Sequence, residues 1–152
     1  MPVTFVPADP GFETRTRASF ARQGAMALIG ARLERVEPGR VEIVLPFRPE
    51  LSQQHGFFHA GMIAAIADSA GGYAGFTLFP PEAGVLTVEF KLNLIAAADG
   101  ERAIALGEVI RSGRTLTVCR LDAFVEKGGE RVHCATGVQT LMALTGRSGV
   151  KD

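Results

Sequence analysis

The residue best suited to chemistry is Asp68, an acidic side chain in the middle of the most apolar segment of the chain. Residues 59–76 read His-Ala-Gly-Met-Ile-Ala-Ala-Ile-Ala-Asp-Ser-Ala-Gly-Gly-Tyr-Ala-Gly-Phe, and no charged residue lies within one helical turn of Asp68. An unpaired carboxylate in a low-dielectric interior is unfavourable unless it accepts hydrogen bonds or takes up a proton. Asp68 is therefore either a satisfied core carboxylate or a base or nucleophile presented to a cleft.

The tripeptide His59-Ala60-Gly61 could supply hydrogen-bond donors for a reacting carbonyl. The first amide groups of a helix lack acceptors within the helix, so the Ala60 and Gly61 amides could polarise a bound carbonyl as an oxyanion hole does. Asp68 follows His59 by nine positions, or about two and a half turns. On one chain that is too far for Asp68 to attack a carbonyl held at the helix start. The geometry works if a symmetry-related chain supplies the second element.

Other polar and aromatic residues cluster just before this segment. His55 and His59 have a spacing that binds metals on a helix, but Gly56 and the neighbouring residues indicate a loop and no third ligand is evident. We therefore expect no metal site, and place His55 in a loop at the cleft. Phe57 and Phe58 either pack in the core, as a hydrophobic staple across the helix start, or line an acyl tunnel.

Hydrophobic periodicity predicts the elements that must position these residues. Apolar anchors predict a helix over 12–29, and the small-residue segment predicts a buried helix over 59–76 that only tertiary packing can hold. Period-two patterns and turn signals predict the strands. The strands span 31–36, 40–47, 86–94, 102–110, 115–125 and 131–144, with a loop over 48–58 and a polar, frayed tail over 145–152. Consecutive strands with few helices indicate one α+β domain over 1–152 with an antiparallel sheet.

Two side-chain placements follow from these strands. In strand 86–94, alternation puts Thr87 and Glu89 on the polar face. A symmetric hairpin turning at 128–129 places Cys119 near Val138, and Cys134 near Ala123. The two thiols then do not face each other, so we expect both to be reduced and the protein to be cytoplasmic.

Composition excludes several classes of function. The chain has 152 residues, with Lys plus Arg and Asp plus Glu at 16 each. A chain with no net charge is a poor match for nonspecific nucleic-acid binding, which depends on neutralising many phosphates. Residues 1–9 lack the features of a signal peptide, and no apolar run reaches the roughly 18 residues that a membrane span needs. We expect neither a nucleic-acid nor a membrane partner.

The segment from His59-Ala60-Gly61 to Asp68 resembles the His-Gly-Gly…Asp signature of hotdog thioesterases of the phenylacetate-pathway (PaaI-like) type. The order of elements from Gln53 to Leu144 is similar to that family over about 100 residues. The resemblance implies the hotdog fold, in which an antiparallel sheet wraps around a central helix. Hydrolysis of an acyl-CoA or acyl-carrier-protein thioester without a cofactor is the implied activity. It also implies homodimers or dimer-of-dimers tetramers with sites at the subunit interface.

The same resemblance implies roles for individual residues. Asp68 is the nucleophile or general base, the Ala60 amide polarises the carbonyl, and His59 shapes the loop and binds nearby. Gln53 stands where many relatives have an asparagine that assists the carbonyl, and Thr87 stands where relatives hold the attacking water.

The chain departs from the family pattern at two positions. Ala60 replaces the usual first glycine, and Gln53 is one methylene longer than asparagine.

Arg111 and Arg114 flank a turn and are typical of solvated surface charge, but the resemblance implies contact with the CoA phosphates.

Two other functions stay open. One is a hydratase or dehydratase acting on enoyl- or hydroxyacyl-CoA, although such enzymes pair Asp and His more closely than His59 and Asp68. The other is a non-catalytic acyl-CoA-binding protein, in which Asp68→Ala would leave binding intact and no turnover would be detected.

Overall fold

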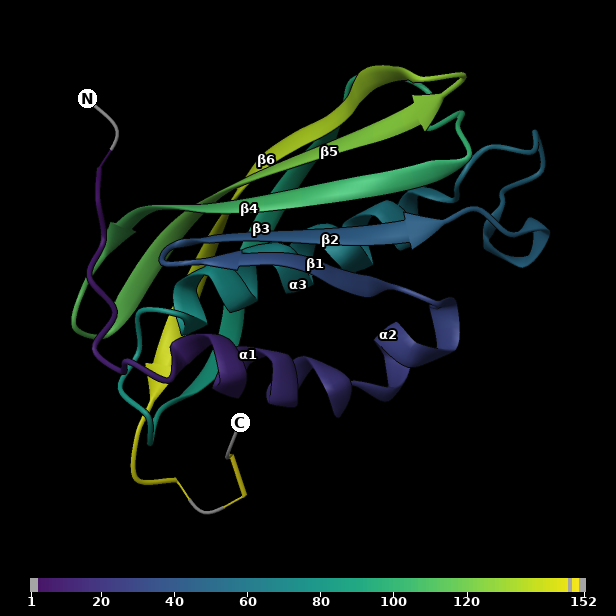
Figure 1. Cartoon of the computed structure of the whole chain (residues 1–152). Coiled ribbons are helices and arrows are strands. Elements are labelled where there is room, and N and C mark those ends of the chain that lie inside the picture. Colours follow the sequence, from purple (N-terminus) through teal and green to yellow (C-terminus); the bar gives the residue numbers. More distant parts are fainter. Residues whose placement is uncertain (1–2, 148, 151–152) are drawn as a thin grey trace.

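A computed structural model describes residues 3–147 and 149–150 and confirms the hotdog arrangement. Six antiparallel strands form one sheet in the order β1-β2-β4-β5-β6-β3, which curls around the long helix α3 (Figure 1). The strands are β1 (Arg32–Glu37), β2 (Arg40–Pro46), β3 (Gly84–Leu94), β4 (Arg102–Ser112), β5 (Leu116–Lys127) and β6 (Glu130–Leu144). A 3-10 turn, η1 (Pro49–Leu51), lies in the predicted loop before α3.

The central helix α3 (Ala60–Phe76) is the buried helix that the small-residue segment predicts, with His59 as its N-cap. Its glycines allow the sheet to approach closely. A Cβ atom on Gly71 would lie 2.4 Å from Leu121 Cδ2, and one on Gly107 of β4 would lie 2.3 Å from the Ala70 carbonyl oxygen. The apolar core is the layer between α3 and the concave face of the sheet.

The single helix predicted over 12–29 is wrong, because two helices occupy this region. They are α1 (Phe12–Ala21) and α2 (Gly24–Ile29), separated at Gln23, which has extended backbone angles. Both helices lie on the side of α3 away from β4 and β5 (Figure 1). The interruption has a physical reason, since it turns the Gln23 side chain inward to bond with α3.

The register of the β5–β6 hairpin differs from the symmetric prediction. Pairing is symmetric near the turn at 128–129, but Cys134 is an extra residue in β6 and shifts the register beyond it. As a result Cys119 pairs with Gln139 and not with Val138. Paired residues in a sheet share a face, so this β-bulge turns Gln139 toward α3 and Val138 outward.

The cysteine prediction holds in its main point, since both thiols are free and buried. Cys134 remains near Ala123, whose carbonyl oxygen accepts a hydrogen bond from Cys134 Sγ at 3.4 Å.

A second bulge, at Val88 in β3, corrects the face assigned to Thr87. Thr87 pairs with Leu141 and Glu89 pairs with Thr140, so Val88 is the extra residue between them. Leu141 is fully buried against α3. Thr87 therefore faces α3 while Glu89 faces the other side of the sheet, and the prediction that the two share a face is wrong.

Within the described part of the chain, no helix has the length and apolar character needed to cross a membrane. The predicted frayed tail falls partly on residues 148, 151 and 152, which lie outside the described residues.

Candidate active site

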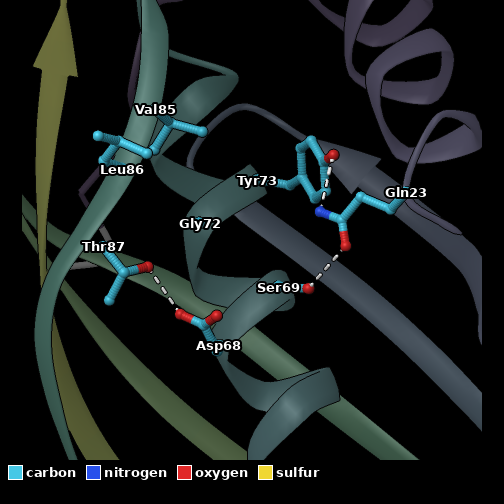
Figure 2. Close-up of a pocket in the computed structure, with 8 residues that line it drawn as sticks. All are labelled: Gln23, Asp68, Ser69, Gly72, Tyr73, Val85, Leu86 and Thr87. Carbon is cyan, nitrogen blue, oxygen red and sulfur yellow. Dashed lines mark hydrogen bonds between the residues drawn. The ribbon is translucent and has the colours of Figure 1, made fainter. Parts of the chain in front are cut away.

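Asp68 and Thr87 lie together at a cavity of about 290 Å³ between α3 and the edge strand β3 (Figure 2). The cavity is lined by Gln23, Asp68, Ser69, Gly72, Tyr73, Val85, Leu86 and Thr87. The start of α2, the helix α3 and the strand β3 thus meet at this cavity, and α3 supplies the carboxylate.

The Asp68 carboxylate is held through one of its two oxygens. Oδ1 accepts a hydrogen bond from Thr87 Oγ1 at 2.7 Å and another from Gln139 Nε2 at 2.6 Å. Oδ2 accepts no hydrogen bond from any described residue. Two donors on one oxygen fix the direction of the carboxylate. The second oxygen is therefore available as a nucleophile or base.

A polar network closes the far side of the cavity (Figure 2). Gln23 Nε2 donates to the Tyr73 hydroxyl at 3.0 Å, and Ser69 Oγ donates to Gln23 Oε1 at 3.4 Å. Tyr73 also bonds to Ser19 of α1 at 3.0 Å. The interruption between α1 and α2 thus provides one wall of the cavity.

A different cavity, of about 370 Å³, is lined by four of the residues that the sequence associates with the carbonyl and the acyl group. Gln53, Phe57, Phe58 and Ala60 line it, together with Ile63, Leu94, Ala96, Ala97, Ala98 and Cys134. Phe58 is also buried in the core against Phe47, so it both packs and lines this cavity. Ala60 is eight residues from Asp68 on α3, which separates them by about 12 Å along the axis. One chain does not bring the two halves of the predicted site together.

The start of α3 presents one free amide and not two. His59 Nδ1 accepts a hydrogen bond from the Gly61 amide at 2.8 Å, which caps the helix. The Ala60 amide has no acceptor among the described residues. The His59 cap therefore occupies the Gly61 amide, and of the two amides expected to polarise a carbonyl only that of Ala60 is left without an acceptor among the described residues.

The remaining predicted binding residues lie away from both cavities. His55 is exposed in the loop, where its backbone amide donates to Gln53 Oε1. Arg111 is the second-last residue of β4, Arg114 lies in the following turn, and both are exposed. Over residues 3–147 and 149–150, no group of three His, Cys, Asp or Glu side chains is arranged to hold a metal ion.

Sequence patterns missed two residues of the site, Gln139 and Gln23. Gln139 is hidden by the bulge at Cys134, which moves it from the outer to the inner face. Gln23 lies within the single helix that periodicity predicts. No short motif marks either position. Ser69 and Tyr73 also line the cavity, but they follow Asp68 by one and five positions, not by the three or four that place side chains together on a helix.

Residues 55–132, just over half of the chain, match the family described as the thioesterase superfamily. A crystal structure of a thioesterase family protein from Silicibacter pomeroyi has a TM-score of 0.88 and 50% sequence identity. It covers 90% of this chain and 100% of that one.

Two more distant structures share the fold. The PaaI protein from the phenylacetic acid degradation operon of E. coli has a TM-score of 0.79 at 12% identity, over 89% of this chain and 94% of that one. A thioesterase from Haemophilus influenzae has a TM-score of 0.77 at 20% identity, over 86% and 90%. Because the family match spans more than half of the chain and agrees with the Silicibacter pomeroyi structure, this chain belongs to the thioesterase superfamily and has its hotdog fold.

Proposed function

We propose that the protein hydrolyses an acyl-CoA thioester, with Asp68 as the catalytic carboxylate. The observation that carries this proposal is the arrangement of Asp68 at its cavity. One oxygen is held by Thr87 and Gln139, and the other is left without a hydrogen bond from the described residues. A carboxylate held in this way is oriented for reaction. Membership of the thioesterase superfamily supports a thioester as the bond that is broken.

Asp68 can act in either of two balanced ways. As a general base, Oδ2 takes a proton from water while the water oxygen bonds to the carbonyl carbon. The C–S bond then breaks, and the thiolate leaves with a proton returned from Asp68. As a nucleophile, Oδ2 bonds to the carbonyl carbon and expels the thiolate, and water hydrolyses the resulting anhydride. Replacing the carboxylate by an amide abolishes both routes.

The second half of the proposed site comes from another copy of the chain. The free Ala60 amide at the positive end of α3 is suited to polarising a thioester carbonyl, but about 12 Å of helix separates it from Asp68 in the same chain. A two-fold dimer would place the Ala60 amide of one copy opposite Asp68 of the other. Gln53, at the same cavity as Ala60, would then lie near the carbonyl.

The β3 edge of the sheet supports this dimer. Among the strands of the described residues, β3 pairs only with β6, so its other edge presents backbone groups that no described strand pairs with. Leu86, Val88 and Phe90 on β3 are 50%, 53% and 40% exposed. A long edge strand with exposed apolar side chains is normally covered by another chain. We expect a two-chain or four-chain mass by light scattering at micromolar concentration, and a monomer mass would refute the shared site.

The acyl group would occupy the cavity beside Asp68, whose volume of about 290 Å³ suits a small acyl group. Arg111 and Arg114 remain predicted contacts for the CoA phosphates, and their exposure at and beside one turn is compatible with that role. An acyl-carrier protein is the alternative donor. Free Cys119 and Cys134 support the prediction of a cytoplasmic, reducing location.

Thiol release from a panel of acyl-CoA esters, measured for wild type and Asp68→Asn, tests this function. Asp68→Asn keeps the shape and removes the charge, so we expect at least a hundredfold loss of kcat with normal folding, in the range for removing a catalytic acid or base. Turnover at the wild-type rate in Asp68→Asn would refute the role of Asp68. Measurable binding of CoA esters with no turnover by the wild type would indicate an acyl-CoA-binding protein.

A further inference from the structure

Gln139 is a fully buried polar residue in a layer of apolar side chains. It lies on the inner face of β6, is 0% exposed, and sits two residues before the buried Leu141. Its amide oxygen Oε1 is buried and accepts no hydrogen bond from any described side chain or backbone group. Such an unsatisfied group destabilises the folded state. An apolar side chain of the same size would remove this penalty, so the presence of glutamine requires a reason other than stability.

The amide nitrogen of Gln139 contacts the groups that the proposed reaction uses. Nε2 donates to Asp68 Oδ1 at 2.6 Å, and lies 3.1 Å from both Thr87 Oγ1 and the Asp68 carbonyl oxygen. Thr87 Oγ1 donates its own proton to Asp68 Oδ1 at 2.7 Å. The two side chains and the carboxylate oxygen form a closed triangle.

The direction of each donor in this triangle is determined by chemistry. An ionised carboxylate only accepts hydrogen bonds, so the amide nitrogen of Gln139 must face it. The reverse orientation would bring Oε1 within 2.6 Å of Asp68 Oδ1, which requires a protonated carboxyl. Gln139 thus restrains Oδ1, which directs Oδ2 to the cavity.

We propose that Gln139 is a positioning residue for hydrolysis, which holds Asp68 and Thr87 in their reactive arrangement without touching the substrate. This inference rests on the proposed function of Asp68. It adds that a buried residue on a strand opposite α3 contributes to kcat and not to substrate binding.

Gly71 of α3 provides the room that Gln139 needs. A Cβ atom on Gly71 would lie 2.0 Å from Gln139 Oε1, closer than any real contact, and would displace the amide. Gly75, one turn further along α3, is crowded in the same way by a different residue. Its Cβ would lie 2.4 Å from Leu141 Cδ1. The two glycines form a matched pair, of which only Gly71 acts on Gln139.

The direct test is Gln139→Met, which keeps the approximate length of the side chain and removes the donor. Loss of a hydrogen bond to a charged group predicts a fall in kcat of about 10-fold to 150-fold. We expect KM for a good acyl-CoA substrate to stay within about threefold, because the substrate does not contact Gln139. The melting temperature should be unchanged or higher, since the unsatisfied amide oxygen is removed. If Gln139 had only a structural role, Gln139→Met would instead lower the melting temperature and leave kcat intact.

Gly71→Ala and Gly75→Ala provide a second, independent test. Both add a methyl group to the packed face of α3, so both should lower the melting temperature. Only Gly71→Ala should also lower kcat, by a factor similar to that of Gln139→Met. Equal values of kcat in the two folded alanine variants would overturn the role of Gln139.

A double-mutant cycle separates this inference from the proposed function. If Gln139 acts through Asp68, then Gln139→Met should change the residual kcat of Asp68→Asn by less than twofold. The inference is overturned if Gln139→Met has the wild-type kcat, or if it lowers kcat equally in both backgrounds. Wild-type turnover by Asp68→Asn is a different result, which removes the proposed function of Asp68 itself.

Discussion

Thr87→Val is the substitution that most directly probes the contact between β3 and the carboxylate. Valine has the size and β-branching of threonine but lacks the hydroxyl that donates to Asp68 Oδ1 at 2.7 Å. Thr87 lies on an exposed edge strand, where valine is a favourable residue. The fold should therefore tolerate the change, and its effect on turnover should report the lost hydrogen bond.

The expected magnitude follows from the charge on Asp68. A hydrogen bond to a charged group contributes about 1.5–3 kcal/mol, which corresponds to about 10-fold to 150-fold in rate. Because Gln139 still donates to the same oxygen at 2.6 Å, the loss should lie near the lower end of this range. We expect the change in kcat with little change in KM, as for a group that orients the catalytic residue.

Thiol release under saturating acyl-CoA measures kcat, and Thr87→Ser is the matched control. Serine keeps the hydroxyl and loses only the methyl group, so it should retain most of the wild-type kcat. If the kcat values of Thr87→Val and Thr87→Ser both lie within twofold of the wild-type kcat, the Thr87 hydroxyl does not assist the reaction. The interpretation that Thr87 and Gln139 orient Asp68 for catalysis would then be wrong.

Three further predictions concern the cavity and the stability of the fold. Gly72→Ala adds a Cβ that meets no atom within 4 Å. It should raise the free energy of unfolding by up to about 1 kcal/mol and raise KM most for the bulkiest acyl-CoA. Arg15→Met removes a guanidinium that donates to three carbonyl oxygens at the end of α3 and stacks on Phe76 at 4.3 Å. It should lower the free energy of unfolding in urea by about 2–4 kcal/mol. Burial raises the pKa of the Cys119 thiol to about 12 and that of Cys134 to about 11, from an ordinary 9.0. The unfolded chain then loses these protons first, so stability should fall as pH rises from 9 to 11, and less so in a Cys119→Ala Cys134→Ala variant.

The catalytic candidate and its helix could be predicted because their signals are local. Asp68 stands alone in an apolar segment, and a buried charge without a local partner is informative at any position. The strand ranges agree with the structure to within two residues, since period-two alternation and turn residues mark them directly. The break at Gln23 was not predicted, because nothing in residues 12–29 shows that a side chain there bonds to Tyr73 of α3.

The partners of Asp68 could not be assigned to their face because both depend on bulges. With strict alternation from the turn at 128–129, Val138 would face α3 beside Cys119, and Gln139 would face outward. The extra residue Cys134 exchanges them.

On β3, the extra residue Val88 separates the faces of Thr87 and Glu89, so that Thr87 faces α3. A bulge is a single-residue insertion with weak sequence preferences, so period-two reasoning fails beyond it. The bulges at Cys134 and Val88 act on the same group. Each brings one hydrogen-bond donor to the same oxygen of Asp68 from neighbouring strands, Gln139 lying two residues from the β6 partner of Thr87. Irregularity in two adjacent strands that converges on one carboxylate is what selection for a reaction would maintain, since a regular sheet would pack Val138 here and leave Asp68 unsupported.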